Sequence, residues 1–301
     1  MDTNYPLVLP TKDERHKIFG SVPPVIGSKP TSKEAMADLQ NKPNDFLFAL
    51  DSVGISNIKH PITIHSGAEP QVQTTIGTFR LTTSLIRDAK GINMSRLTEQ
   101  LDQYHQEGWI VDLPHLCKFT KELAERMNQH GAEVEVTFPW FFERKGPVLK
   151  KKGLMHAEAG MKVKIDENQI FHTEISLKAT VTTLCPCSKE ISEYSAHNQR
   201  GLITIRAEII DPIEQEADWK IKLLDAAESN ASALIHPVLK RPDEKAVTET
   251  AYENPRFVED MVRLIAADLY EMEWIRSFTV ECRNEESIHL HDAIATLSFR
   301  K

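Results

Sequence analysis

The feature that most constrains the fold of this 301-residue chain is an order of secondary-structure elements that occurs twice. Runs rich in Thr, Ile and Val predict strands, and apolar residues at helical spacing predict helices. The first occurrence consists of strands at 61–65 and 72–84, helices at 93–105 and 113–129, and strands at 133–143 and 155–165. The order is therefore strand, strand, helix, helix, strand, strand.

The second half repeats this order with a longer helical part. Asn254 is expected to cap the last helix, because Pro255 suits a first helical position. The predicted elements are strands at 171–184 and 201–210, helices at 219–231 and 254–271, and strands at 277–283 and 288–299. We expect an α+β fold of two tandem β2α2β2 units, with antiparallel sheets covered by helices on one face. The open sheet edges favour oligomerisation.

The region before the first unit is expected to be an extended arm over residues 1–60. Six of the sixteen prolines lie there, and proline disfavours helix in the residue before it. One short helix is predicted at 32–40. The arm is either a disordered tail or packs partly on the body through apolar residues near Phe48. The two units are then expected at 61–166 and 167–301.

Composition and charge exclude several classes of protein. The formal net charge of −8 disfavours a general nucleic-acid binder, which needs a basic face. Because no apolar run reaches about 18 residues, no membrane helix is predicted. The polar N-terminus has no apolar signal core, so the expected location is the cytosol. Four cysteines do not indicate a disulfide framework, and a close pair indicates metal binding or catalysis.

The most informative segment is the long connection between the strands at 171–184 and 201–210. It contains Cys185, Cys187 and His197 among polar residues. Long polar insertions in a hairpin are often functional, and thiolates and imidazoles are common ligands of zinc and similar ions. The alternative is two buried thiols and a histidine that caps a helix.

Two further groups carry candidate chemistry. His289 and His291 would point to the same side of a strand, which suits metal binding or proton transfer; the alternative is two exposed histidines at a sheet edge. Glu259, on the predicted last helix, is either solvent-exposed or an acceptor for the N–H groups of a guanine edge. A basic run at 150–152 is expected to be solvated surface. A basic pair at 240–241 lies near His236 and Glu244, on a segment expected to be a loop bounded by prolines.

Five motifs of this chain together resemble the motifs of a known family. The motifs are Leu184-Cys-Pro-Cys-Ser-Lys-Glu-Ile-Ser, Ala196-His-Asn-Gln-Arg-Gly201, Lys90-Gly-Ile-Asn-Met-Ser-Arg96, Phe257-Val-Glu-Asp260 and Ile288-His-Leu-His291. In this order they are similar to the signature of type IB GTP cyclohydrolases, over roughly residues 50–301. The resemblance implies the tunnelling fold and a homotetramer with active sites at subunit interfaces. It also implies one divalent metal per site (zinc, manganese or iron(II)) and no organic cofactor.

The resemblance also implies roles for individual residues. GTP would be the substrate, and 7,8-dihydroneopterin triphosphate and formate the products. Cys185, His197 and Glu244 would bind the metal, and Glu259 the guanine ring, with Lys240 and Arg241 as further candidates for substrate binding. The implied catalytic residues are Cys185, Cys187, Glu286, His289 and His291.

Three other functions are consistent with parts of the pattern. A nitrile reductase of the same fold would use a cysteine nucleophile and NADPH, but the chain has no nicotinamide fingerprint. A structural zinc module would use the Cys and His side chains for folding alone. A pterin-aldehyde synthase would share the fold and differ in substrate.

Overall fold

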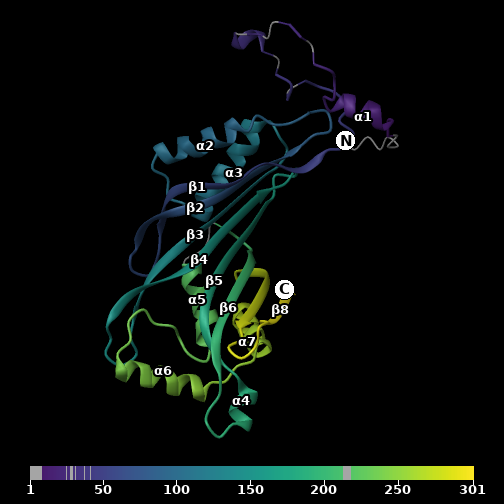
Figure 1. The fold of residues 1–301 in the computed structure, drawn as a ribbon. Coiled ribbons are helices and arrows are strands. Elements are labelled where there is room, and N and C mark those ends of the chain that lie inside the picture. Colours follow the sequence, from purple (N-terminus) through teal and green to yellow (C-terminus); the bar gives the residue numbers. More distant parts are fainter. Residues whose placement is uncertain are drawn as a thin grey trace.

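The structure is a computed structural model of the chain that describes residues 9–24, 26–27, 30, 32–36, 38–40, 42–212 and 218–301. Eight strands form one antiparallel sheet in which every strand pairs with its neighbours in sequence (Figure 1). The strands are β1 (Leu50–His65), β2 (Val72–Leu85), β3 (Ala132–Lys145), β4 (Lys152–Ile165), β5 (Phe171–Leu184), β6 (Asn198–Ile209), β7 (Ile275–Glu285) and β8 (Ala293–Arg300). The predicted α+β class with antiparallel strands is therefore confirmed.

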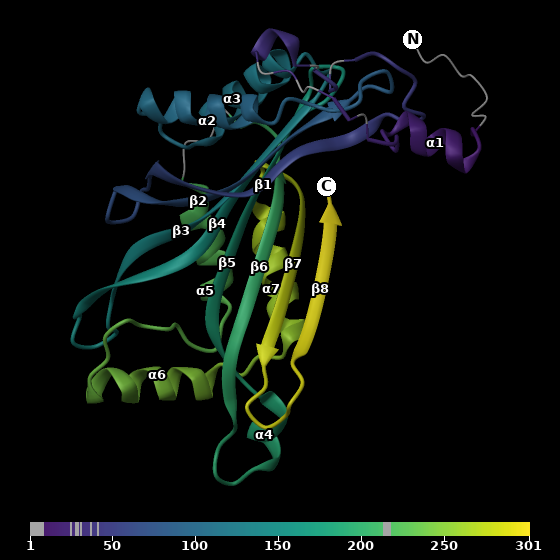
Figure 2. The same ribbon diagram turned by 45° about the horizontal axis from the view of Figure 1, so that its top comes forward.

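The helices are inserted at two main points of this sheet. One group lies between β2 and β3, and a second lies between β6 and β7; Figure 2 shows α5 and α7 behind β5 to β7. The helices are α1 (Lys12–Ile18), the 3-10 helix η1 (Lys33–Ala35), α2 (Ser95–Gln106), α3 (Leu113–Met127), α4 (Pro186–Ile191), α5 (Trp219–Ser229), α6 (Arg241–Glu253) and α7 (Val258–Glu271). No helix of the described ranges has the length and apolar composition needed to cross a membrane.

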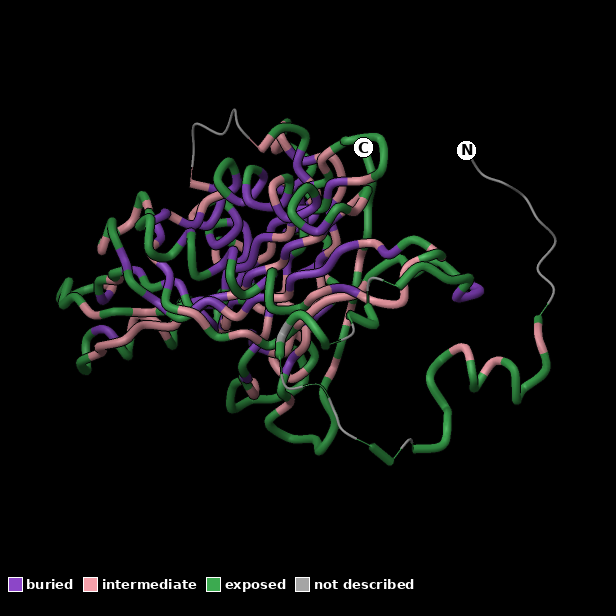
Figure 3. Tube along the Cα trace, turned by 90° about the horizontal axis from the view of Figure 1, so that it is seen from above, coloured by how far each residue is buried: buried purple, intermediate pink, exposed green. Residues whose placement is uncertain are grey.

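Strict alternation in the strands produces one apolar sheet face. In β3, Val134, Val136 and Phe138 are buried, whereas Glu133 and Glu135 point to the other face. The apolar face packs against both helix groups, and the buried side chains form one large hydrophobic cluster that runs through the body. Figure 3 shows this buried interior beside a mostly exposed N-terminal segment. The burial of this face is the main stabilising contribution to the fold.

The opposite sheet face is polar, and in the described part of the chain no helix covers it (Figure 2). Arg80 and Lys162 both pair with Glu133, at 2.5 and 3.3 Å, so charges from β2, β3 and β4 neutralise one another. Arg276 of β7 pairs with Glu208 of β6 at 3.2 Å. Water can therefore cover this face without contacting a large apolar surface.

Two predicted strand boundaries differ from the structure by five residues or more, and the others agree within three. The first strand begins at Leu50 rather than at 61, inside the segment assigned to the arm. It is an edge strand with a register shift between Ile55 and Ile58, where Asn57 has a φ of 60°, so its polar and exposed residues do not alternate regularly. The last strand begins at Ala293 rather than at 288.

The helical predictions also need correction. The segment that contains Glu244 was expected to be a loop bounded by prolines, but it forms α6. Pro242 lies in the first turn of α6, where proline is tolerated because that N–H has no helical partner. The last helix begins at Val258 rather than at 254, and the Asp260 side chain accepts a hydrogen bond from the Phe257 N–H at 2.9 Å. A helix was predicted at 32–40, but the described residues of that segment form only the short 3-10 helix η1.

Candidate active site

Three chain segments meet at one end of the sheet. β5 ends, β6 begins and β7 ends at this edge, because Leu184 pairs with Asn198 and Arg200 pairs with Glu285. The residues that follow or precede these pairs are therefore brought together although they are up to about a hundred positions apart in sequence. Helix α4 and its loop project beyond this end of the sheet (Figure 2).

Cys185 lies at the N-cap position of α4 and is half-buried. Its Sγ accepts a hydrogen bond from the Ser188 N–H at 3.4 Å, and its own N–H donates to the His197 carbonyl at 3.1 Å. Cys187 is the second residue of α4 and is exposed. The two thiols therefore have different environments, and Cys185 is the one fixed beside His197.

The His197 ring is held in a defined orientation. Its Nδ1 lies 2.9 Å from Gln199 Oε1, and the Gln199 amide nitrogen donates to Thr183 Oγ1 at 3.1 Å. This arrangement leaves Gln199 Oε1 to accept the Nδ1–H, so Nε2 carries the lone pair. Metal-binding histidines in proteins are oriented in this way by a hydrogen bond to the second ring nitrogen.

Glu286 is the carboxylate beside this histidine. Its Oε2 lies 3.9 Å from His197 Nδ1, and both side chains are largely buried, with 12% and 15% of their surfaces exposed. Ser287 Oγ lies 3.5 Å from the same nitrogen. The structure thus places Glu286 beside His197, whose backbone carbonyl is bonded to Cys185.

His289 and His291 lie on the exposed loop between β7 and β8, and not on a strand as predicted. Their rings nevertheless stack, with centroids 4.8 Å apart and planes inclined by 15°. A contact between Arg283 and Asp292 ties the end of this loop to β7. The two imidazoles are therefore side by side and accessible to a substrate.

Glu259 is exposed on the first turn of α7 and, among the described residues, makes no hydrogen bond or ion pair. The start of α7 is tied to the end of β5, because the Arg256 N–H donates to the Leu184 carbonyl at 3.0 Å. Burial, followed by the negative charge of Glu259, raises the pKa of the Cys282 thiol to about 12. Cys282 is therefore a protonated core residue.

Glu244 does not join Cys185 and His197 within one chain. It is exposed in the first turn of α6, whereas Tyr252, near the other end of that helix, accepts a hydrogen bond from the Lys189 Nζ at 2.6 Å. Eight helical residues separate these two positions by about 12 Å. In the described part of the chain, no three His, Cys, Asp or Glu side chains are placed to hold a metal.

The donors that are present nevertheless fit a divalent metal in their chemistry. A cysteine sulfur and an imidazole Nε2 with a fixed ring suit zinc and related ions. The observation that supports this fit is the pair of hydrogen bonds made by Gln199, one to His197 and one to Thr183. They fix the orientation of the His197 ring, as is common for histidines that bind a metal. A third protein ligand has to come from a carboxylate outside this pair.

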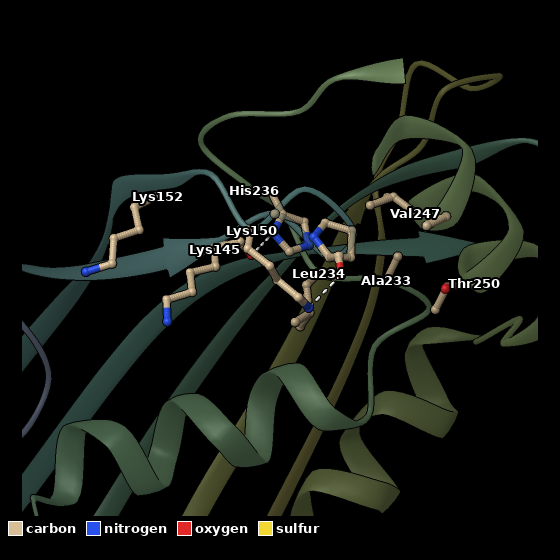
Figure 4. A pocket seen from close by; sticks show the side chains of 11 residues that line it. Lys145, Lys150, Lys152, Ala233, Leu234, His236, Val247 and Thr250 are labelled. Carbon is tan, nitrogen blue, oxygen red and sulfur yellow. Dashed lines mark hydrogen bonds between the residues drawn. The ribbon is translucent and has the colours of Figure 1, made fainter. Parts of the chain in front are cut away.

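Lys240 and Arg241 are exposed at the start of α6, away from the Cys185 site, and neither lines the large cavity beside that helix. This cavity has a volume of about 930 Å³ and was not predicted. Figure 4 shows its basic side chains, Lys145, Lys150, Lys152 and His236, together with apolar ones. The run at 150–152 was expected to be solvated surface.

Comparison with known proteins identifies the family. The family model described as "Type I GTP cyclohydrolase folE2" matches residues 36–295. The chain belongs to the FolE2 family of type I GTP cyclohydrolases. It is 69% identical to "GTP cyclohydrolase FolE2" of Halalkalibacterium halodurans, over 97% of this chain and 98% of that protein. A FolE2 protein of Bacillus subtilis is 60% identical, over 99% and 98% of the two chains.

Solved structures of other proteins share the fold with this FolE2 family member. The uricase of Arthrobacter globiformis has a TM-score of 0.51 and 9% sequence identity, over 83% of this chain and 93% of that one. At this identity the similarity concerns the fold alone. It places the arrangement of sheet and helices in the same structural class as urate oxidases.

Proposed function

We propose that this protein is a GTP cyclohydrolase I, which opens the imidazole ring of GTP by hydrolysis and yields 7,8-dihydroneopterin triphosphate and formate. This reaction is the first step of folate and pterin biosynthesis. The observation that carries the proposal is the grouping of Cys185, His197 and Glu286 at one end of the sheet, in a chain that belongs to the FolE2 family.

One divalent metal (zinc, manganese or iron(II)) would be held by Cys185 and His197. When bound, such an ion supplies Lewis acidity and lowers the pKa of water toward neutrality. The chain itself positions the reacting groups. Gln199 holds the His197 ring, and the carboxylate of Glu286 lies beside that ring in a largely buried position.

His289 and His291 are the proposed proton-transfer groups. An imidazole exchanges protons near neutral pH, and these two rings are exposed at the same edge as the Cys185 site. Glu259 is the proposed acceptor for the paired N–H groups of guanine, because its carboxylate is exposed and has no hydrogen-bond or ion-pair partner in the described residues. Cys187 is exposed beside these groups.

The finer architecture is proposed to be the tunnelling fold of two tandem β2α2β2 units, assembled into a homotetramer. The open edges at β1 and β8 support this assembly. A subunit interface would allow Glu244 of a neighbouring subunit to reach Cys185 and His197 and to complete the ligands. Light scattering should show a tetramer at micromolar concentration, and a fully active monomer would rule this assembly out.

The reaction is tested by incubating the purified protein with GTP and with zinc, manganese or iron(II) in turn. Pterin fluorescence after oxidation and one equivalent of formate are the expected products. A nitrile-bearing deazapurine with NADPH serves as the control substrate and should give no turnover. If neither pterin nor formate is formed with any of the three metals, the proposed function is wrong.

A further inference from the structure

The cavity beside α6 is built from three parts of the chain. The end of the β3–β4 hairpin forms one wall, the segment at 233–238 a second, and the Ala246, Val247 and Thr250 side of α6 a third. The hairpin and the 233–238 segment approach closely, because a Cβ on Gly153 would lie 2.7 Å from Pro237. The cavity is therefore a defined space between packed segments.

Buried polar contacts make this frame rigid. Arg144 pairs with Glu228, and both side chains are about nine-tenths buried; Arg144 also donates to the Ile235 carbonyl at 2.7 Å. Asp243 is fully buried and accepts hydrogen bonds from the N–H groups of Val148 and Leu149 at 2.9 and 3.0 Å. The carboxylates of Glu228 and Asp243 therefore bind Arg144 and backbone N–H groups, and not the lysines of the cavity.

Two of the three lysines have no carboxylate partner among the described residues. Lys145 and Lys152 lie directly opposite each other in the β3–β4 pair, an arrangement of like charges that destabilises a sheet. Lys152 pairs with Glu143 at 2.6 Å, whereas Lys145 and Lys150 form no ion pair in the described part of the chain. Lys150 has a left-handed φ of 54°, and its Nζ donates to the Pro147 carbonyl at 2.7 Å (Figure 4).

His236 adds a further group on the inner wall of the cavity. Its Nδ1 lies 3.2 Å from the Lys145 carbonyl, and burial, followed by the positive charge of Arg144, lowers its pKa. The remaining lining is largely apolar and includes Leu234 and Val247. A ligand that matches these walls has several negative charges at one end and an apolar or aromatic part at the other.

We propose that this cavity binds the oligophosphate chain of a nucleotide through Lys145, Lys150 and Lys152. An oligophosphate offsets the repulsion between the paired lysines and offers several acceptors to their ammonium groups. Ala233 lines the cavity and pairs with Thr182, which lies three residues before Cys185. Assignment of the triphosphate of GTP itself to this cavity rests on the proposed function.

The test measures binding of inorganic tripolyphosphate by calorimetry at low ionic strength. Lys145→Gln and Lys150→Gln should each weaken binding by about tenfold or more, as expected for the loss of one charged hydrogen-bond donor. Lys151→Gln is the matched control, because Lys151 is exposed on the same hairpin and does not line the cavity. It should bind tripolyphosphate like the unaltered protein.

Steady-state kinetics then identify the source of the phosphates. If tripolyphosphate raises the KM for GTP and leaves kcat unchanged, the cavity holds the phosphates of the substrate. If it alters kcat without competing with GTP, the cavity holds a separate phosphate ligand. Equal tripolyphosphate affinity in all three lysine variants would overturn the cavity proposal even in an active enzyme. Lysine-dependent binding in a protein that forms no pterin would overturn only the proposed reaction.

Discussion

Replacing Cys185 by alanine is expected to remove both the bound metal and the turnover of GTP. Cys185 is one of the two proposed metal donors, and its backbone N–H is bonded to the carbonyl of the other, His197. Loss of a thiolate leaves the imidazole as the only protein donor from that pair, which is insufficient for a stable site. Elemental analysis of the purified variant, measured together with pterin formation, checks this result.

Cys187→Ala provides the control, because it makes the same chemical change at an exposed position two residues away. It should retain much of its metal, whatever its rate. His289 and His291 variants should also retain metal while their turnover slows. A full metal complement in Cys185→Ala, combined with its loss in Cys187→Ala, would show that the ligand assignment is wrong.

Replacing Glu259 by alanine should weaken GTP binding and leave the metal in place. A carboxylate that accepts two N–H groups of guanine contributes charged hydrogen bonds, and losing them typically costs about 1.5–3 kcal/mol, or roughly 10- to 150-fold in affinity. Because Glu259 is exposed on the first turn of α7, the variant should fold like the unaltered protein. Equilibrium binding of GTP to the metal-loaded variant measures the effect.

Glu271→Ala is the matched control for this change, since Glu271 is an exposed residue at the other end of the same helix. It should bind GTP with unchanged affinity. Equal affinities for GTP in Glu259→Ala, Glu271→Ala and the unaltered protein would refute the role of Glu259 in guanine recognition.

Most of the sheet could be predicted from sequence because its buried strands alternate regularly. β3, for example, has a buried apolar residue at nearly every second position. The edge strand β1 lacks this signal over its first residues, where exposed polar side chains and a register shift interrupt the alternation. Helix α6 buries only Asp243 and Ala251, so it has no continuous apolar stripe to reveal it.

The candidate site was predictable where its residues are close in sequence. Cys185 and His197 lie in one loop, and their pairing follows from the hairpin that surrounds it. The position of Glu244 relative to them depends on the direction of α6, which sequence spacing does not determine. The lysine cavity was missed, although a hairpin register that places Lys145 opposite Lys152 would have signalled the concentration of charge.

The helix-free face of the sheet has a consequence for the order in which the protein folds and assembles. Several of its charges are already paired within the chain, as between Arg80 and Glu133 or between Arg276 and Glu208. A newly made subunit can therefore expose this face to water without a large apolar penalty, unlike a protomer whose hydrophobic interface must be covered before it is stable. Folding of the chain and the proposed association of its copies can then be separate events. Folding would not depend on protein concentration, whereas association would.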